Sequence, residues 1–182
     1  MNTIIRQFLL LTVLFACNQL SAHSTAIDLS GKWQVKLDST NTGLNQQWQE
    51  QSFETTIQLP GTTDDAGIGF PNLLLPKLER PQVLRLTRKN SYVGPAWYTR
   101  KVNIPRNWKN KQVVLKLERV IWETRVWVDG REVNAVQESL STPHYFDLTG
   151  YLTPGEHRLT VRVDNSKKYD ISVTDMAHAY TN

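Results

Sequence analysis

The sequence predicts an all-β domain, built as a β-sandwich or jelly roll or closed as a barrel. Three observations lead to this prediction. Apolar and polar residues alternate along several short segments, turn-forming residues separate these segments, and no long segment repeats its apolar residues with a helical period. Several short strands joined by turns are typical of sandwiches and barrels.

The first residues are expected to be an export signal and not part of the fold. Arg6 supplies a basic start, and the apolar run from Phe8 to Ala16 is too short to span a bilayer as a stable helix. Cleavage after Ala22 would remove residues 1–22 and release a soluble protein. Cleavage before Cys17 would instead leave a lipid-anchored protein, because a small residue followed by Cys resembles a bacterial lipobox. Both alternatives predict export, to the periplasm, the outer membrane or the medium.

The composition excludes several other classes of protein. Cys17 is the only cysteine, so the mature domain has no internal disulfide and must be stabilised by burial. The 21 basic residues barely outnumber the 17 acidic ones and are scattered along the chain, whereas a nucleic-acid-binding protein would gather them in a stripe or a known motif. We therefore expect a single domain with one core and no nucleic-acid partner.

The first half of the chain predicts two strands and two loops. Residues 31–37 and 53–59 alternate apolar and polar side chains, as strands with one buried face do. Residues 39–51 between them are polar and are expected to form a loop. Residues 63–90 show no period, and loops of this length in compact domains usually cover a face or a functional site.

A longer strand is predicted after the turn at Gly94 and Pro95, and Pro105 ends it because proline has no N–H to donate. One face is expected to be buried, with Tyr98, Val102 and Ile104. The other is expected to be wet, with Thr99, Lys101 and Asn103. Arg100 falls on the apolar face, so we expect it to lie near a strand end or to meet a carboxylate.

Four further strands are predicted in the second half. Residues 113–117 alternate, and residues 125–128 and 131–136 flank Asp129-Gly130, a strong signal for a type I′ hairpin turn. Residues 157–163 form the last clear strand.

A connector is expected at residues 143–152, in which Asp147 and Thr149 can cap a turn.

Five segments carry a family resemblance, and they are residues 94–105, 113–118, 126–130, 143–149 and 155–165. In their order and spacing they resemble the N-terminal sugar-binding domain of glycoside hydrolase family 2, in its β-galactosidase-like members. The resemblance implies a jelly roll of the galactose-binding-domain-like type over residues 27–165. Residues 166–182 would be a truncated linker towards a missing next domain.

The resemblance also implies what the parent protein does. Members of the family hydrolyse O-glycosyl bonds with retention, using two glutamates on a barrel that follows the sugar-binding domain. No segment of this sequence matches the motif that carries those glutamates, so we expect no catalytic residue here. Glu118 and Glu123 are the tempting substitutes, but Glu118 lies on the polar face of a predicted strand, where a solvated glutamate is ordinary. The expected function is that of a front domain in an exported glycosidase of carbohydrate metabolism.

Three residues are candidates for sugar contacts by the same resemblance. In the family, contacts come from the loop before the strand that begins at Pro95 and from the stretch after the last strand, which here points to Asn90, Asp164 and Asn165. Short polar side chains at strand ends can pair rigidly with sugar hydroxyls. The alternative is that Asp164 and Asn165 only form an Asx turn.

Other residues are weaker candidates. His178 and Tyr180 in the tail could face a site of the parent enzyme, or could be ordinary surface residues. Trp33 and Trp97 are expected to pack, whereas Trp122 and Trp127 are better candidates for an exposed platform that stacks on sugars, although packing is the commoner role for them too. No metal or cofactor motif is recognisable.

Two rival functions remain open. The chain could be a free-standing carbohydrate-binding module without catalysis, or a structural domain of another exported carbohydrate-active enzyme, such as an esterase. The sequence stops at Asn182 without a closing signal, which favours a fragment.

Overall fold

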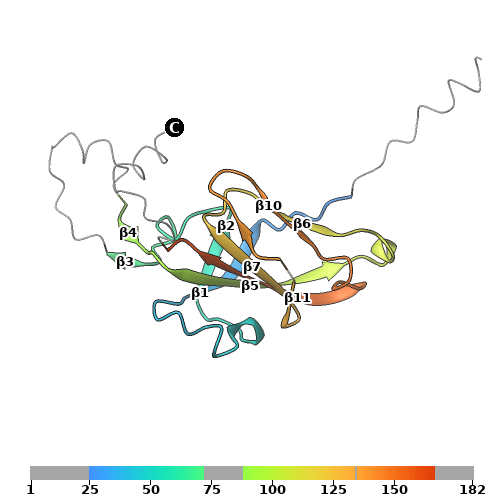
Figure 1. The fold of residues 1–182 in the computed structure, drawn as a ribbon, viewed down its shortest axis with the longest axis horizontal. Helices are drawn as coiled ribbons and strands as arrows, with labels where there is room; N and C mark the ends of the chain where they lie inside the picture. Colours follow the sequence, from blue (N-terminus) through green and yellow to red (C-terminus); the bar gives the residue numbers. More distant parts are fainter. Residues whose placement is uncertain (1–24, 72–87, 134, 167–182) are drawn as a thin grey trace, which may run out of the picture.

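The computed structural model describes three stretches of the chain, residues 25–71, 88–133 and 135–166. The predicted leader with Cys17, and the tail with His178 and Tyr180, lie outside the described residues. Within these stretches no helix is long and apolar enough to cross a membrane. The fold is all-β, as the alternating segments predicted (Figure 1).

A seven-stranded antiparallel sheet forms the main layer, with strands in the order β2-β1-β5-β11-β7-β8 and β9 also paired to β7. Its two longest strands, β5 and β11, pair along their whole length at its centre (Figure 1). The strands are β1 (Gly31–Leu37), β2 (Thr56–Leu59), β5 (Pro95–Ile104), β7 (Glu123–Val128), β8 (Arg131–Glu132), β9 (Gln137–Glu138) and β11 (Gly155–Asp164).

Two small antiparallel sheets accompany the main one. β6 (Val114–Leu117) pairs with β10 (His144–Asp147), and β3 (Phe70–Pro71) pairs with β4 (Asn90–Ser91). Short 3₁₀ turns, η1 (Trp48–Glu50) and η2 (Arg106–Trp108), lie in the connections.

The connector expected at residues 143–152 is therefore wrong in its first half, because β10 is a strand. His144 and Phe146 point into the protein while Tyr145 and Asp147 point out, and the inward histidine hid this alternation. The turn that follows is as predicted, since the Asp147 carboxylate accepts hydrogen bonds from the backbone N–H and the hydroxyl of Thr149.

The principal core lies between the main sheet and the β6–β10 pair. Leu115 and Phe146 from the small sheet pack in one cluster with inward residues of the main sheet. In β11 these are Leu159 and Val161, which the alternating pattern had placed on one face. This two-layer packing is that of a β-sandwich.

A second core covers part of the outer face of the main sheet. Trp48 and Phe53 come from the segment that follows β1, and they pack on Trp97 of β5 and Trp127 of β7. The prediction that one face of β5 is wet is therefore wrong for its first half, where Thr99 is also buried. The alternation correctly grouped residues by face, but the loop over residues 38–54 covers the face that was expected to meet water.

Arg100 lies in the middle of β5 and not at a strand end. Its guanidinium donates to the carbonyl oxygens of Leu29, at 2.7 Å, and Ser30, at 3.1 Å, and lies over the ring of Trp33. Hydrogen bonds from Ser30 lower the pKa of Asp28, and the charge of Arg100 adds to this effect. The expected carboxylate is thus only a longer-range neighbour, while backbone carbonyls accept hydrogen bonds from the Nη1 of this half-buried guanidinium.

The hairpin at Asp129-Gly130 has the predicted turn, since both residues have positive φ, 50° and 81°. The return strand is shorter than expected, because β8 ends at Glu132 and pairing with β7 resumes only at β9. The second predicted strand also begins later, at Thr56, because Phe53 turns into the second core.

Candidate functional site

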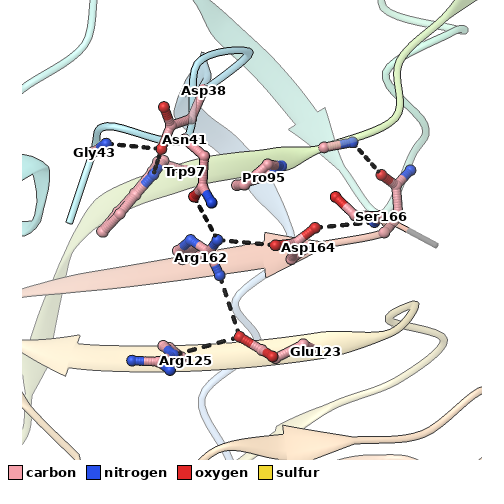
Figure 2. A network of polar contacts seen from close by, with 12 residues as sticks. Asp38, Asn41, Gly43, Pro95, Trp97, Glu123, Arg125, Arg162, Asp164 and Ser166 are labelled. Carbon is pink, nitrogen blue, oxygen red and sulfur yellow. Dashed lines mark hydrogen bonds and ion pairs between the residues drawn. The ribbon is translucent and has the colours of Figure 1, made fainter. Parts of the chain in front are cut away.

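The three residues predicted to contact sugar come together at one end of the main sheet. Asp164, the last residue of β11, lies opposite Pro95 of β5 and Glu123 of β7. Asn165 follows it, and its side chain bonds to the segment just before β5. Asn90 lies in β4, directly before that segment. The end of the main sheet therefore brings Asp164 and Asn165 next to the residues around the start of β5, and Figure 2 shows Asp164 beside Pro95.

Arg162 is the centre of the polar network at this end (Figure 2). Its Nη1 donates to Glu123 at 3.2 Å, and its Nη2 donates to Asp164 at 2.9 Å and to Asn41 at 3.0 Å. The side chain of Arg162 is only 4% exposed, so the two carboxylates compensate a cation that has left water. The fork of the guanidinium fixes where both carboxylates lie.

The network continues outward along β7. Arg125 contacts Glu123 at 3.4 Å and Glu132 at 3.5 Å, and Figure 2 shows it beside Glu123 at the edge of the group. These outer pairs are partly exposed and are expected to contribute little to stability. Their effect is to place Glu123 between two cations.

Asp164 is held in an ionised, acceptor-only form. Burial opposes ionisation, but hydrogen bonds from Ser166 and the nearby Arg162 guanidinium outweigh it and hold the pKa of Asp164 below its ordinary value. Its Oδ1 accepts from the Ser166 N–H at 2.9 Å, which is the Asx turn that the sequence offered as an alternative. A carboxylate has about four lone-pair positions, so further capacity remains for hydroxyl donors. Its side chain is 18% exposed, which leaves it reachable.

The side chain of Asn165 joins the end of β11 to the backbone just before β5. Its Oδ1 accepts from the Gly94 N–H at 2.8 Å, and its Nδ2 donates to the Tyr92 carbonyl at 3.1 Å. The amide therefore clamps the residues before β5 to the end of β11. The hydroxyl of Tyr92 completes this arrangement by donating to the Pro95 carbonyl at 2.7 Å. Burial raises the pKa of Tyr92 to about 12, which keeps this donor protonated.

Asn90 is placed by its backbone. It pairs with Pro71 in the short β3–β4 ribbon, and its N–H donates to the Asp64 carboxylate at 2.7 Å. The residue as a whole is half-buried. The role of Asn90, Asp164 and Asn165 as sugar contacts stays a prediction.

The tryptophans follow the packing role that the sequence favoured, and the alternative of an exposed platform fails for Trp127. Trp33 and Trp97 are buried, in agreement with their expected packing role. Trp127 is also buried, and it stacks on Trp97 with ring centroids 5.0 Å apart, so it is no exposed platform. Trp122 is partly buried and donates its indole N–H to the Asn165 carbonyl at 3.1 Å, which ties it to the sheet end.

The two glutamates considered as substitutes for catalytic groups each form ion pairs with basic side chains. Glu118 is exposed and pairs with Lys116, whose hydrogen bond lowers the pKa of Glu118. A general acid needs the opposite shift. Glu123 accepts a hydrogen bond from the Arg162 guanidinium and is part of the polar network. Among the described residues, no group of three His, Cys, Asp or Glu could hold a metal ion.

A groove of about 700 Å³ lies away from this end of the main sheet. It runs between the segment before β1 and strand β6, and its lining is mostly apolar. Residues of this lining include Ile27, Leu29, Trp108, Leu115, Leu117 and Leu152. Sugar sites need converging polar groups, and the hydrogen-bonded network at the sheet end provides them.

Sequence reasoning missed Arg162 and Asn41. Arg162 alternates with Leu159, Val161 and Val163 in β11, so the pattern placed it on a wet face. Its flanking acidic residue, Asp164, was the one available signal of an ion pair. Asn41 lies 121 residues away from Arg162 in the sequence, and no local pattern could have joined them.

Comparisons with known proteins point to a single family. Residues 27–178 match the model for "Glycosyl hydrolases family 2, sugar binding domain". The chain is 28% identical to a β-glucuronidase of Paenibacillus borealis over 145 residues, which are 76% of this chain and 21% of that protein. It is 26% identical to a β-galactosidase of Streptococcus thermophilus over 147 residues, covering 74% of this chain and 14% of that protein.

Solved structures agree with the fold. The β-glucuronidase of Ruminococcus gnavus in complex with uronic isofagomine superposes with a TM-score of 0.59 at 19% identity, over 75% of this chain and 20% of that one. A β-glucuronidase from an uncultured Clostridium superposes with a TM-score of 0.58 at 25% identity, over 78% and 24%. The chain thus spans about a quarter or less of the length of the proteins it matches.

Proposed function

This chain belongs to the sugar-binding domains of glycosyl hydrolase family 2, and on that basis we propose that it is the carbohydrate-contacting front domain of a β-glycosidase. Its part in the enzyme is to form one wall of the sugar site, while the groups that break the O-glycosyl bond belong to a following domain. The family match over residues 27–178, with coverage of only 21% of a full-length β-glucuronidase, is the observation that carries the proposal.

The sheet end supports this role. Asp164 offers an ionised carboxylate whose position is fixed by Arg162 and by the Ser166 N–H, with lone pairs left for hydroxyl donors. Polar groups held by a rigid sheet bind with little loss of conformational entropy. We propose that Asp164 accepts hydroxyl hydrogens of a bound β-glycoside, with Asn90 beside it and with Asn165 holding the neighbouring segment in place.

The substrate class in the proposal is a β-glycoside. The relatives include enzymes named β-glucuronidase and β-galactosidase, and the sequence motifs resemble those of β-galactosidase-like members. A panel of p-nitrophenyl β-galactoside, β-glucuronide and β-mannoside tests the choice among them in the full-length protein.

The first experiment separates a domain from a complete module. Genomic DNA is read beyond the codon for Asn182, and the longest protein is expressed and assayed on this panel beside the 182-residue chain. We expect turnover by the long protein and none by the short one. A stop codon directly after Asn182, with sugar binding but no turnover, would instead support the free-standing carbohydrate-binding module.

Asp164→Asn in the full-length protein tests the site itself. The amide keeps the shape and the bond from Ser166 but removes the charge, so kcat/KM is expected to fall about tenfold. Asp147→Asn is the matched control, because Asp147 forms a similar Asx turn with Thr149 in the other sheet. Unchanged kinetics for Asp164→Asn across the whole panel would remove Asp164 from the proposed site.

Export is part of the proposal and is supported by the basic start and apolar run of residues 1–22. Mass spectrometry of the mature N-terminus tests it. A chain that begins at His23 would indicate soluble secretion, and an acylated Cys17 would indicate a lipid anchor. An intact Met1 on protein recovered from its native cells would contradict export by either route.

A further inference from the structure

Two apolar side chains stand exposed at the same sheet end. Phe70 of β3 is 61% exposed and Val93, two residues before β5, is 71% exposed, although both flank the buried Tyr92. The ring centroids of Phe70 and Tyr92 lie 6.3 Å apart, so one side of the exposed phenylalanine ring packs against the buried tyrosine. Single exposed apolar side chains are common on protein surfaces, and this pair is distinguished by its place beside the polar groups of the sheet end.

The backbone imposes the exposure of Val93. Asn165 accepts a hydrogen bond from the N–H of Gly94 and donates one to the carbonyl of Tyr92, so it clamps the chain on both sides of Val93. Gly94 has a φ of 141°, and a Cβ there would approach the Tyr92 hydroxyl to 2.9 Å. The valine side chain is consequently directed outward by contacts that are themselves buried or partly buried.

Phe70 is held in a similar way. It pairs with Ser91 across the β3–β4 ribbon, and Gly69 beside it has a φ of 133°. A Cβ at Gly69 would come within 2.9 Å of the Ser91 carbonyl, so the ribbon closes tightly at this point. The aromatic ring is therefore presented by a fixed backbone, which is the condition for a preorganised binding surface.

Polar groups rim this apolar pair. Asn90 pairs with Pro71, next to Phe70. The side chain of Asn165 bonds to the backbone beside Val93, and Asp164, the last residue of β11, directly precedes Asn165. An apolar surface with a few placed polar groups is the usual composition of a small-ligand site. A protein partner would need about 800 Å² on each side, which two side chains do not supply.

We propose that Phe70 and Val93 form an apolar platform that takes the carbon–hydrogen face of a pyranose ring. The ring would lie on Phe70, the hydrocarbon of Val93 would extend the contact, and the hydroxyls at the ring edge would reach the polar rim. This inference rests on the proposed function, because it names the apolar half of the same sugar site.

Phe70→Ala in the full-length protein tests the platform. Kinetics are measured on p-nitrophenyl β-galactoside and β-glucuronide, together with saturation-transfer NMR of methyl β-galactoside and methyl β-glucuronide. We expect KM to rise about fivefold with kcat within twofold, and the saturation transfer to the ring protons to weaken, as for the loss of a stacking contact. Phe70→Trp should restore both, because it keeps an aromatic face.

Tyr145→Ala is the matched control. Tyr145 is an aromatic residue that is 52% exposed on β10, in the other sheet, so its removal should leave KM and the NMR signal unchanged. Thermal unfolding of each variant is recorded, since loss of stability in Phe70→Ala without a change in KM would mean that Phe70 packs against another domain and would overturn the platform.

The outcomes separate this inference from the proposed function. Turnover by the wild type with equal KM in Phe70→Ala overturns the platform alone. Absence of turnover on the panel, with saturation transfer that depends on Phe70, contradicts the glycosidase and supports the platform. Absence of both signals in the wild type contradicts both proposals.

Discussion

Asp38 is a fully buried carboxylate that fastens the segment after β1 to the sheet. Its oxygens accept hydrogen bonds from the N–H groups of Thr42, at 2.8 Å, and Gly43, at 2.9 Å, and from the Trp97 indole at 3.1 Å. Three donors compensate the loss of water around this group. Together with the bond between Asn41 and Arg162, they join the segment to the polar network shown in Figure 2.

Gly43→Ala is expected to destabilise the protein by about 2 kcal/mol, because overpacking a rigid site forces its neighbours to move. A Cβ at Gly43 would lie 2.5 Å from the Trp97 Nε1 and 2.6 Å from the Asp38 Oδ2, and both residues are buried. Urea unfolding measures the effect. Gly150→Ala is the control, since a Cβ there meets nothing within 4 Å. Equal losses in the two variants would refute the close packing at Gly43.

At the scale of elements, the loop over residues 38–54 is a covering layer with its own core. Trp48 lies 6.2 Å from Trp97 and 6.3 Å from Phe53, measured between ring centroids, and the Lys36 ammonium lies over its ring. The loop thus buries Trp97 of β5 and Trp127 of β7, which the main sheet would otherwise expose. This covering layer also places Asn41 against Arg162, so packing and site geometry are coupled.

Trp48→Ala is expected to cost about 3 kcal/mol, since it empties the centre of the second core. The loss should be local: hydrogen exchange of residues 38–54 should accelerate far more than that of β6 and β10, which contact the first core. Tyr145→Ala, at an exposed aromatic residue, serves as the control. A uniform acceleration across the whole protein would show that the two cores unfold as one unit.

At the scale of the whole molecule, two aspartates with lowered pKa values make the free energy of unfolding depend on pH. The pKa of Asp164 is lowered in the fold, where burial is outweighed by hydrogen bonds from Ser166 and by Arg162, and the pKa of Asp129 is lowered by bonds from Arg158 and His157 against the same burial effect. A group with a lowered folded pKa contributes stability above its unfolded pKa and loses it as the pH falls through the folded value.

The free energy of unfolding is therefore expected to fall as the pH drops below about 5, and to go on falling until the pH lies below the lowered folded pKa values of these aspartates. Urea midpoints measured across this range would show the loss. Asp164→Asn should be less stable at pH 7 and should show a shallower fall with acid. A variant whose acid dependence matches that of the wild type would indicate that Asp164 does not contribute to it.

Sequence patterns alone correctly predicted the all-β class, the residues that share a face in β1, β5 and β11, the hairpin turn at Asp129-Gly130 and the family to which the chain is similar. These features are local, because a period of two and a turn conformation depend on neighbours in the chain. The resemblance of the five motifs also pointed to Asn90, Asp164 and Asn165 as candidates, and their role in sugar binding stays a prediction.

Only the tertiary structure decided which faces are covered and which charges meet. Alternation groups Trp97 with Thr99, but it does not say that a loop will bury them. It likewise does not bring Asn41 to Arg162 across 121 residues, or turn the residues around His144 into a strand of the second sheet. The physical reason is that burial and ion pairing depend on what packs against a residue, and such partners come from distant parts of the chain.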